Sequence, residues 1–467
     1  SIIDQSNSGR QPMFSFSKRY LIVFNGEIYN AQNLKKLLDK KQLKGNSDTE
    51  ILVNLFEKYG VNILEKIDGM FSFFIYDFKN KSGFIARDRF GIKPLYYLKK
   101  DKYILLSSEI KPILKYSKKN TFNDRAFADF LIRQKMDHEN STFFKEINSL
   151  EPCNYAFIKS KKIFKKSYWD IKEKIINSDF STLKKKYFDL FEKSVEKHLI
   201  SDRKIGLLFS AGTDSTMLAT LMKKRLNYSV QTYTYDFINN KFGDSYKSKI
   251  ISNKLNIINK TTLVRPLDIK KDIKKVCLEL ESPFTSIRIF GVRKALQLMK
   301  EDNLSVVFEG GGGDEILGGY DYNLIFYYLD QILKSKKNIY KFFDQILKNN
   351  KKNKILNFLM NISNQYGSIK DCTPFVNIEN FNKNFLNENL NEEFFFNETF
   401  PSRLNNLQKS QYIDIKFVNL PRSLKYSDRL SMNQNLENRV PFLDHYLAKF
   451  CFNLANDYKI KNNITRY

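Results

Sequence analysis

Two short apolar runs in the second half of the chain have the pattern of buried β-strands. Residues 205–209 read Ile-Gly-Leu-Leu-Phe, and residues 304–308 read Leu-Ser-Val-Val-Phe. After the first run, apolar side chains at positions 217, 218, 221 and 222 recur with helical spacing. A buried strand, a polar loop and a helix in this order predict an α/β domain whose parallel sheet is flanked by helices.

The first half of the chain has a different pattern. Stretches at 20–30 and 69–77 alternate apolar and polar positions and are bounded by polar turns, which predicts short strands. Helices are predicted near 31–43 and 47–59. The strand-type pattern gives way near 165–170 to a helix.

That helix is predicted around 181–199, with an apolar face typical of a core-facing helix. A chain of 467 residues is long enough for two domains with separate cores. We therefore expect one domain over 1–165 and a second over 180–467. Between 322 and 360, aromatic and aliphatic residues at helical intervals also predict core rather than a base-stacking surface. One face would hold Leu324, Tyr327, Tyr328, Gln331 and Ile332.

The loop after the first apolar run has the composition of a phosphate-binding turn. It reads Ser210-Ala211-Gly212-Thr213-Asp214-Ser215 and leads directly into the predicted helix. Free backbone N–H groups and the positive end of a helix dipole attract a phosphate at such a junction. No GxxxxGK[ST] motif is present, so this is not a Walker A loop. The alternative is an ordinary turn in which Ser and Asp only cap the helix.

A second loop of this kind follows residues 304–308. It contains the four glycines 310–313, preceded by Glu309 and followed by Asp314 and Glu315. Consecutive glycines allow the backbone to approach a ligand closely, and an acidic pair suits a magnesium ion held between carboxylates and phosphates. Loops at the carboxyl ends of two strands in an open α/β sheet predict a nucleotide site.

Composition narrows the function only slightly. The net charge of +27 raises the question of nucleic-acid binding, but the lysines are spread along the whole chain and no nucleic-acid-binding motif accompanies them. We therefore expect no nucleic-acid partner. Four widely separated cysteines without a CxxC motif favour a reduced, cytoplasmic setting, and the apolar runs are too short to predict a membrane span. His445 is interpreted as structural rather than as a metal ligand.

The N-terminal half offers a separate chemical clue at Asn25-Gly26. This pair after a predicted strand is typical of a hairpin turn. It also supplies a side-chain amide and a backbone N–H, the donors that make an oxyanion hole.

These motifs together resemble the glutamine-dependent asparagine synthetases of the bacterial B type. The resemblance extends to Ser427-Asp428-Arg429-Leu430-Ser431-Met432 and to the segment 436–445. It implies a class II glutamine amidotransferase domain with an N-terminal-nucleophile αββα sandwich, followed by an ATP-pyrophosphatase synthetase domain. The implied reaction adenylates aspartate with ATP and Mg²⁺, and ammonia from glutamine passes through a tunnel and displaces AMP. A homodimer and small-molecule substrates are also implied.

The same resemblance implies individual roles. Glutamine would be bound by Ile2, Ile3, Asn25, Gly26, Glu27 and Asp48, with Asn25 and Gly26 stabilising the oxyanion. ATP would be bound by Leu208, Ser210, Gly212, Asp214, Ser215, Tyr235, Glu309 and Gly310. Magnesium would be held by Asp214 and Asp314, and Arg466 stands where the family has a catalytic lysine.

The chain also departs from that family. Ala211 replaces a glycine, and Gly311 stands where the family places an acidic residue, so Glu309 is the candidate to supply that carboxylate from two positions away. Residue 1 is serine, and residues 1–4 match an internal family segment, so we expect the nucleophilic cysteine to be missing. Residues 464–467 match a family segment that continues into further helices, so we expect those helices to be missing too. As written, the polypeptide is expected not to hydrolyse glutamine.

These departures leave three readings open. In the first, the enzyme amidates aspartate. In the second, it amidates a uronic acid of a surface polysaccharide or a peptide carboxylate. In the third, the protein is a non-catalytic relative.

Overall fold

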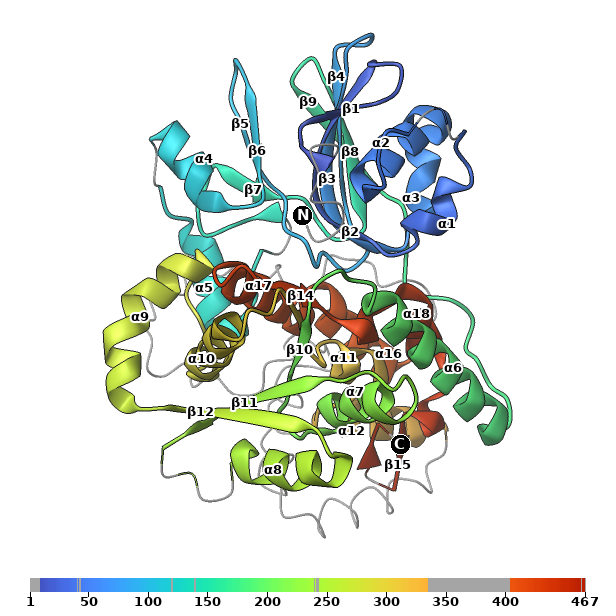
Figure 1. The fold of residues 1–467 in the computed structure, drawn as a ribbon, viewed down its shortest axis with the longest axis vertical. Helices are drawn as coiled ribbons and strands as arrows, with labels where there is room; N and C mark the ends of the chain where they lie inside the picture. Colours follow the sequence, from blue (N-terminus) through green and yellow to red (C-terminus); the bar gives the residue numbers. More distant parts are fainter. Residues whose placement is uncertain are drawn as a thin grey trace.

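The computed structural model describes residues 9–39, 41, 43–118, 121–137, 140–238, 240, 243–334, 404–462 and 464–466. Ile2 and Ile3 lie outside these residues, as does the chain from 335 to 403 that contains most of the predicted 322–360 helical region. The described part forms an upper, mostly antiparallel half and a lower half around a parallel sheet (Figure 1).

The upper half begins with a six-stranded antiparallel sheet in the order β1-β2-β3-β4-β8-β9. Its strands are β1 (Met13–Phe14), β2 (Tyr20–Ile28), β3 (Gly69–Asp77), β4 (Ser82–Arg87), β8 (Asn154–Lys159) and β9 (Lys162–Ser167). One face packs against helices, with Ile22 and Phe73 in the same core as Leu55. These helices are α1 (Ala31–Lys35), α2 (Asp48–Tyr59), the 3₁₀ turn η3 (Gly60–Asn62) and α3 (Ile63–Lys66).

The opposite face packs against a smaller sheet in the order β6-β5-β7. Ile85 and Ala156 of the large sheet share a core with Leu95 and Leu106, and the small sheet in turn packs against α4. Its elements are β5 (Tyr96–Lys99), β6 (Ile104–Ser107), α4 (Ile110–Ser117), α5 (Asp124–Arg133) and β7 (Ile147–Ser149). The layers therefore run helix, sheet, sheet, helix, as the αββα expectation requires.

The predicted helix over 31–43 is wrong in length, because α1 ends at Lys35. The amides of Lys36, Leu37 and Leu38 bond to carbonyls three residues back rather than four. The chain thus leaves the helix through tight turns, while Leu38 remains buried. The second predicted helix, near 47–59, is present as α2 with Ser47 at its N-cap.

The lower half contains a five-stranded parallel sheet in the order β12-β11-β10-β13-β14. Its strands are β10 (Ile205–Leu208), β11 (Gln231–Phe237), β12 (Ile258–Val264), β13 (Val306–Phe308) and β14 (Glu437–Arg439). Successive residues of β13 enter different cores: Val306 and Phe308 face one layer of helices, and Val307 faces the other. Burial on both faces explains why this strand is apolar throughout.

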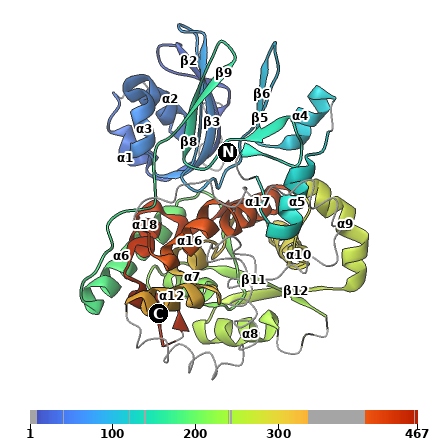
Figure 2. The same cartoon turned by 180° about the vertical axis from the view of Figure 1, so that it is seen from behind.

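Helices cover both faces of this sheet (Figures 1 and 2). The layer on the Phe308 side includes α6 (Phe180–His198), α7 (Thr213–Lys224), α8 (Asp244–Leu255) and α18 (His445–Asn453). The opposite layer includes α9 (Pro266–Leu280), α10 (Arg288–Glu301) and α17 (Asn419–Met432). Further elements are α11 (Gly313–Leu317), α12 (Asn323–Lys334), α16 (Asn406–Lys416), η7 (Pro441–Leu443), η8 (Asn456–Tyr458), β15 (Ile460–Lys461) and β16 (Ile464–Thr465).

Leu324 is buried in a small core, and Tyr327 packs against it, so this part of the predicted aromatic face is core. None of the helices in the described part of the chain is both long and apolar enough to cross a membrane.

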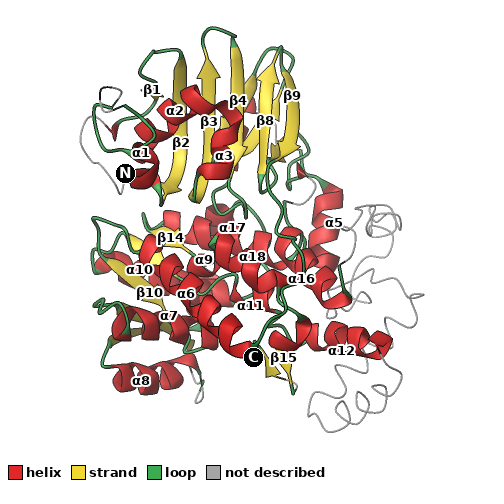
Figure 3. Ribbon diagram, turned by 90° about the vertical axis from the view of Figure 1, so that its right-hand side faces the viewer, coloured by secondary structure: helices red, strands yellow, loops and turns green. Residues whose placement is uncertain are grey.

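The two halves meet along α17 and α18, below the large antiparallel sheet (Figure 3). Lys93 of the upper half donates to Asp428 of α17 at 3.1 Å, and both side chains are buried. Glu281 of the lower half accepts hydrogen bonds from the amides of Ile110 and Lys111 at the start of α4. Polar and charged contacts therefore tie the two halves together.

Candidate active site

The loops that follow β10 and β13 open into one cavity of about 320 Å³. β10 and β13 are adjacent parallel strands with Leu207 opposite Phe308, so their carboxyl ends lie side by side. The cavity lining includes every residue that the sequence assigned to ATP: Leu208, Ser210, Gly212, Asp214, Ser215, Tyr235, Glu309 and Gly310. Asp314 and Arg466 line it too.

The first loop presents the N-terminus of α7 to this cavity. Gly212 is the N-cap residue and has no side chain that could cap the helix. The Ser210 hydroxyl accepts from the Gly212 amide at 3.3 Å and lies 3.3 Å from the Ser215 hydroxyl, while the Asp214 carboxylate binds Arg466. The capping alternative is therefore wrong, and the amides of the first helical turn remain available to an anion.

The second loop touches the first. A β-carbon placed on Gly310 would lie 2.8 Å from the β-carbon of Asp214, and one placed on Gly313 would lie 2.8 Å from the Asp214 Cγ. Gly312 adopts a positive φ of 94°, which side-chain-bearing residues rarely adopt. The run of glycines is thus what allows the two loops to come into contact.

Two carboxylates meet at this contact. Arg466 Nη1 lies 2.6 Å from Asp214 Oδ2 and 2.8 Å from Asp314 Oδ1. Burial raises the pKa of Asp214 to about 6, with Asp314 adding to the rise and Arg466 opposing it. Burial also raises the pKa of Asp314. Two oxygens that already share one cation are a donor set that suits Mg²⁺ together with phosphate oxygens.

The wall opposite the loops is formed by β11 and α10. Tyr235 accepts a hydrogen bond from Arg288 Nε at 3.1 Å, and its ring leaves no room for a side chain on Gly291 of α10. The sequence did not predict several residues that line other parts of this cavity as well as this wall: Thr213, Tyr233, Thr234, Asp244 and Val292. Apart from Thr213, they come from a strand and helices whose sequences carry no glycine-rich signal.

A second cavity, of about 550 Å³, lies between the two halves, and residues of the lower half such as Arg203, Met432 and Glu437 form part of its lining. Its lining includes Asn25, Gly26, Glu27 and Asp48, four of the six residues assigned to glutamine. Asn25 and Gly26 lie inside β2, paired with Ser72 and Phe71 of β3, so the hairpin-turn interpretation is wrong. Gly26 has φ 150°, and a β-carbon there would lie 2.1 Å from the Met70 carbonyl oxygen.

Two acidic side chains of this cavity, Glu27 and Asp48, are buried and desolvated. Burial, with Glu437 and Asp48 nearby, raises the pKa of Glu27 well above its usual range. Burial also raises the pKa of Asp48, although its carboxylate accepts from the amides of Ile28 at 3.1 Å and Thr49 at 2.7 Å. A cationic ligand such as an α-ammonium group would compensate this desolvated negative charge.

Strand β14 lines the second cavity and contacts the lining of the first. Glu437 lines the second cavity and accepts from Arg439 Nε at 2.7 Å. The fully buried Arg439 also lies 3.8 Å from Glu27. Between them, Asn438 donates to Glu309 in the first cavity at 2.8 Å. Three consecutive residues thus connect the walls of the two cavities.

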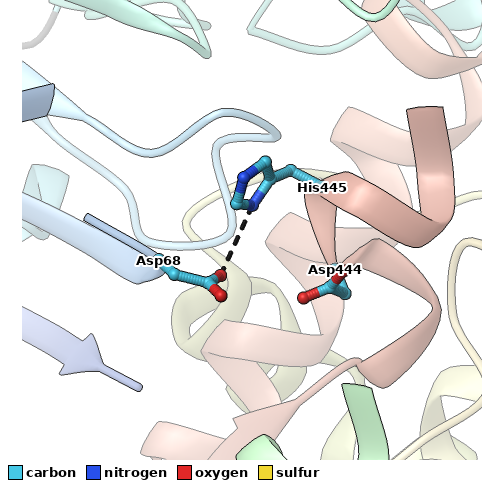
Figure 4. Close-up of side chains that lie close together, drawn as sticks. All are labelled: Asp68, Asp444 and His445. Carbon is cyan, nitrogen blue, oxygen red and sulfur yellow. Dashed lines mark ion pairs between the residues drawn. The ribbon is translucent and has the colours of Figure 1, made fainter. Parts of the chain in front are cut away.

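A separate group of metal-ligand type lies between the halves. One ligand atom each from Asp68, Asp444 and His445 lie within 4.8 Å of one another. Figure 4 shows the His445 ring directed at Asp68, at 3.4 Å from Nδ1 to Oδ1. Lys197 donates to both Asp68 and Asp444, and its ammonium occupies the place of a cation. We therefore interpret His445 as part of an ion-pair cluster between the halves.

Comparison with known proteins gives two family matches, one in each half of the chain. The family model of a glutamine amidotransferase domain matches residues 1–169, and that of asparagine synthase matches residues 186–467. Asparagine synthetase [glutamine-hydrolyzing] 1 of Bacillus subtilis is 27% identical over 482 residues, covering 100% of this chain and 75% of the relative. Asparagine synthetase [glutamine-hydrolyzing] 2 of the same species is 27% identical, covering 96% of this chain and 59% of the relative.

A third relative carries another name. Amidase chry2 of Gibberella zeae is 24% identical, over 99% of this chain and 74% of the relative. The two domain matches, in this order and over nearly the whole length, assign the family. The chain belongs to the asparagine synthase family and carries a glutamine amidotransferase domain ahead of its synthetase domain.

Proposed function

We propose that the protein is an asparagine synthase that uses glutamine as its nitrogen donor and aspartate as its acceptor. An aspartate carboxylate oxygen attacks the α-phosphorus of ATP, and the bond to the bridging oxygen breaks, so that pyrophosphate leaves. Ammonia then attacks the acyl carbon and AMP departs. The observation that carries the proposal is the single cavity shared by the two loops that follow β10 and β13.

The chain's own groups have distinct tasks in this scheme. The amides at the start of α7 and the Ser210 and Ser215 hydroxyls bind the departing pyrophosphate. Arg466 lies close enough to both loops to stabilise the negative charge that moves onto that pyrophosphate. Asp214 and Asp314 would hold a Mg²⁺ ion, which when bound neutralises phosphate charge. In the second cavity, Asn25 and Gly26 would stabilise the oxyanion formed when glutamine is hydrolysed.

Product analysis tests this proposal. The purified protein is supplied with ATP, Mg²⁺, ammonium chloride and aspartate, so that the outcome does not depend on glutamine hydrolysis. We expect AMP and pyrophosphate in equal amounts, and only when an acceptor carboxylate is present. Release of ADP and phosphate, or AMP formation without any acceptor, would contradict the proposal.

Substitutions of the two proposed magnesium ligands test where the reaction takes place. Asp214→Asn and Asp314→Asn should each lower AMP formation by at least about 100-fold, because each removes one carboxylate from the metal-type pair. Asp101→Asn, on an exposed turn of the other domain, is the matched control and should retain wild-type activity. Full activity in either of the first two variants would remove the assigned metal roles.

A second acceptor class has specific support. One relative that matches nearly the whole chain is named an amidase rather than an asparagine synthetase. Gly311, which lines the nucleotide cavity, also stands where the resembled family has an acidic residue. Uronic acids and carboxylate-ended peptides should therefore be tested beside aspartate. AMP formation with one of these but not with aspartate would assign the second class, and none with any carboxylate would favour a non-catalytic relative.

The remaining expectations belong to the same proposal. A cytoplasmic setting is supported by the free thiols of Cys153, Cys277 and Cys451 in the described part of the chain. The homodimer expected from the resemblance stays a prediction.

A further inference from the structure

Glu309 differs from the other acidic residues of the nucleotide cavity in its partners. It follows β13 directly and lines the cavity. Its Oε2 accepts from the Ser427 hydroxyl at 3.0 Å, and its Oε1 accepts from Asn438 Nδ2 at 2.8 Å. Both donors are neutral. Asp214 and Asp314, in contrast, share the guanidinium of Arg466.

The Glu309 carboxylate fills the space beside Gly311. A β-carbon placed on Gly311 would lie 3.2 Å from Glu309 Oε1 and 3.4 Å from Val440 Cγ1. A larger residue at 311 would therefore displace the carboxylate from Asn438. Glycine at 311 and glutamate at 309 are thus matched to each other in this chain.

A carboxylate in this position needs a cation. Desolvation raises the pKa of Glu309, and its two neutral hydrogen-bond donors only partly offset that rise. Burying a carboxylate without a cationic partner is unfavourable, unless it is protonated or receives a positive charge from a ligand. The triphosphate of ATP is anionic and would not supply this charge. The ligand that Glu309 suits is therefore a small cation that enters the cavity after or beside the nucleotide.

The side from which this cation would enter the nucleotide cavity is indicated by the elements that bind Glu309. Ser427 is on α17 and Asn438 is on β14, and both elements lie on the side of the synthetase sheet that faces the amidotransferase domain (Figure 1). Glu437, the neighbour of Asn438, lines the second cavity, to which Asn25, Glu27 and other amidotransferase residues contribute. Glu309 is thus held by two elements on the side of the synthetase domain that faces the amidotransferase domain (Figure 1).

We propose that Glu309 is the catalytic residue that receives the nitrogen nucleophile, by binding ammonium and taking one proton from it. This step rests on the proposed ligase function. An N–H bond breaks, its electron pair stays on nitrogen, and the proton passes to a Glu309 oxygen. The nitrogen pair forms the new C–N bond, and the C–O bond to AMP breaks with its electrons leaving on the phosphate. That phosphate oxygen takes the second proton lost by nitrogen.

Two nucleophiles separate this role from a structural one. At neutral pH ammonia is almost wholly ammonium and needs a base, whereas hydroxylamine is mostly unprotonated and does not. We expect Glu309→Gln to lower ammonium-dependent amide formation by about 100-fold or more, in the range of general-base contributions. With hydroxylamine, hydroxamate formation should fall by less than about tenfold. Glu301→Gln, exposed at the end of α10, is the control.

The adenylation half-reaction is measured in the same preparations as acceptor-dependent exchange of labelled pyrophosphate into ATP. Wild-type protein that shows no such exchange with any carboxylate would refute the ligase function itself. If the wild type exchanges but Glu309→Gln loses ammonium and hydroxylamine reactions equally, the proposed proton transfer is refuted. Ammonium-dependent activity within threefold of wild type in the variant would refute it as well.

Discussion

At the scale of single residues, the phosphate loop contains a strained position. Ala211 has φ 56°, in the left-handed region where a β-carbon is unfavourable. The sequence marks Ala211 as an unusual residue for such a loop, and the structure gives the physical reason. A glycine would adopt this conformation without strain.

Ala211→Gly should therefore stabilise the protein. Relief of the left-handed strain is worth about 1–2 kcal/mol, and the greater chain entropy of glycine returns about 0.5–1 kcal/mol of that. We expect the free energy of unfolding to rise by about 1 kcal/mol in urea titrations. Ala219→Gly, inside α7 and fully buried, should instead lower it by about 1 kcal/mol. An Ala211→Gly variant less stable than the wild type would contradict the claim that the backbone is strained at this position.

The structure brings together the residues that a sequence motif singled out, while their roles stay predictions. Asp214, Asp314 and Arg466 were each named from sequence, and they meet at one point. Thr234 and Asp244 of the same cavity were missed. Their positions depend on how β11 and α8 pack beside β10, which no local pattern specifies.

At the scale of elements, buried strands were predicted well and the ends of short helices less well. β10 and β13 are apolar because helices cover both faces, and that leaves a clear run in the sequence. α1 is shorter than predicted because hydrogen bonding changes after Lys35. The role of α17 could not be foreseen, since its charged residues pair with partners hundreds of positions away.

Arg429 of α17 provides the element-scale test. Its guanidinium lies 3.1 Å from Glu281 Oε2, and both side chains are almost fully buried. Arg429→Met leaves a buried carboxylate without its cation, so we expect the free energy of unfolding to fall by about 3 kcal/mol. Arg225→Met removes an exposed pair with Glu192 and should cost less than about 1 kcal/mol. Equal effects of the two substitutions would contradict a structural role for the α17 pair.

At the scale of the whole molecule, the short strand β14 lines the cavity between the two domains and contacts the lining of the nucleotide cavity. The sequence indicated two domains and their order, but not that Glu437 would line one cavity while Asn438 binds Glu309 of the other. That arrangement arises from β14 being the edge strand of the parallel sheet, next to the amidotransferase domain. Contacts of such long sequence separation leave no periodic signal in the chain.

The buried Lys93–Asp428 pair tests the coupling of the two domains. Lys93→Met should lower the free energy of unfolding by about 3 kcal/mol, because Asp428 is left buried without its partner. The double variant Lys93→Met/Asp428→Leu should recover part of that loss. Calorimetric scans of the single variant should show the two domains unfolding at more separated temperatures than in the wild type. If the free-energy changes of the two single substitutions simply add in the double variant, the pair does not couple the two domains.

Titration calorimetry with Mg²⁺ and a non-hydrolysable ATP analogue tests most directly whether both loops bind one nucleotide. We expect one nucleotide per chain, with affinity at least about tenfold weaker in Ser215→Ala of the first loop and in Gly310→Ala of the second. The added methyl at 310 would meet Asp214 and push the two loops apart. Two nucleotides per chain, or wild-type affinity in either variant, would contradict a shared site.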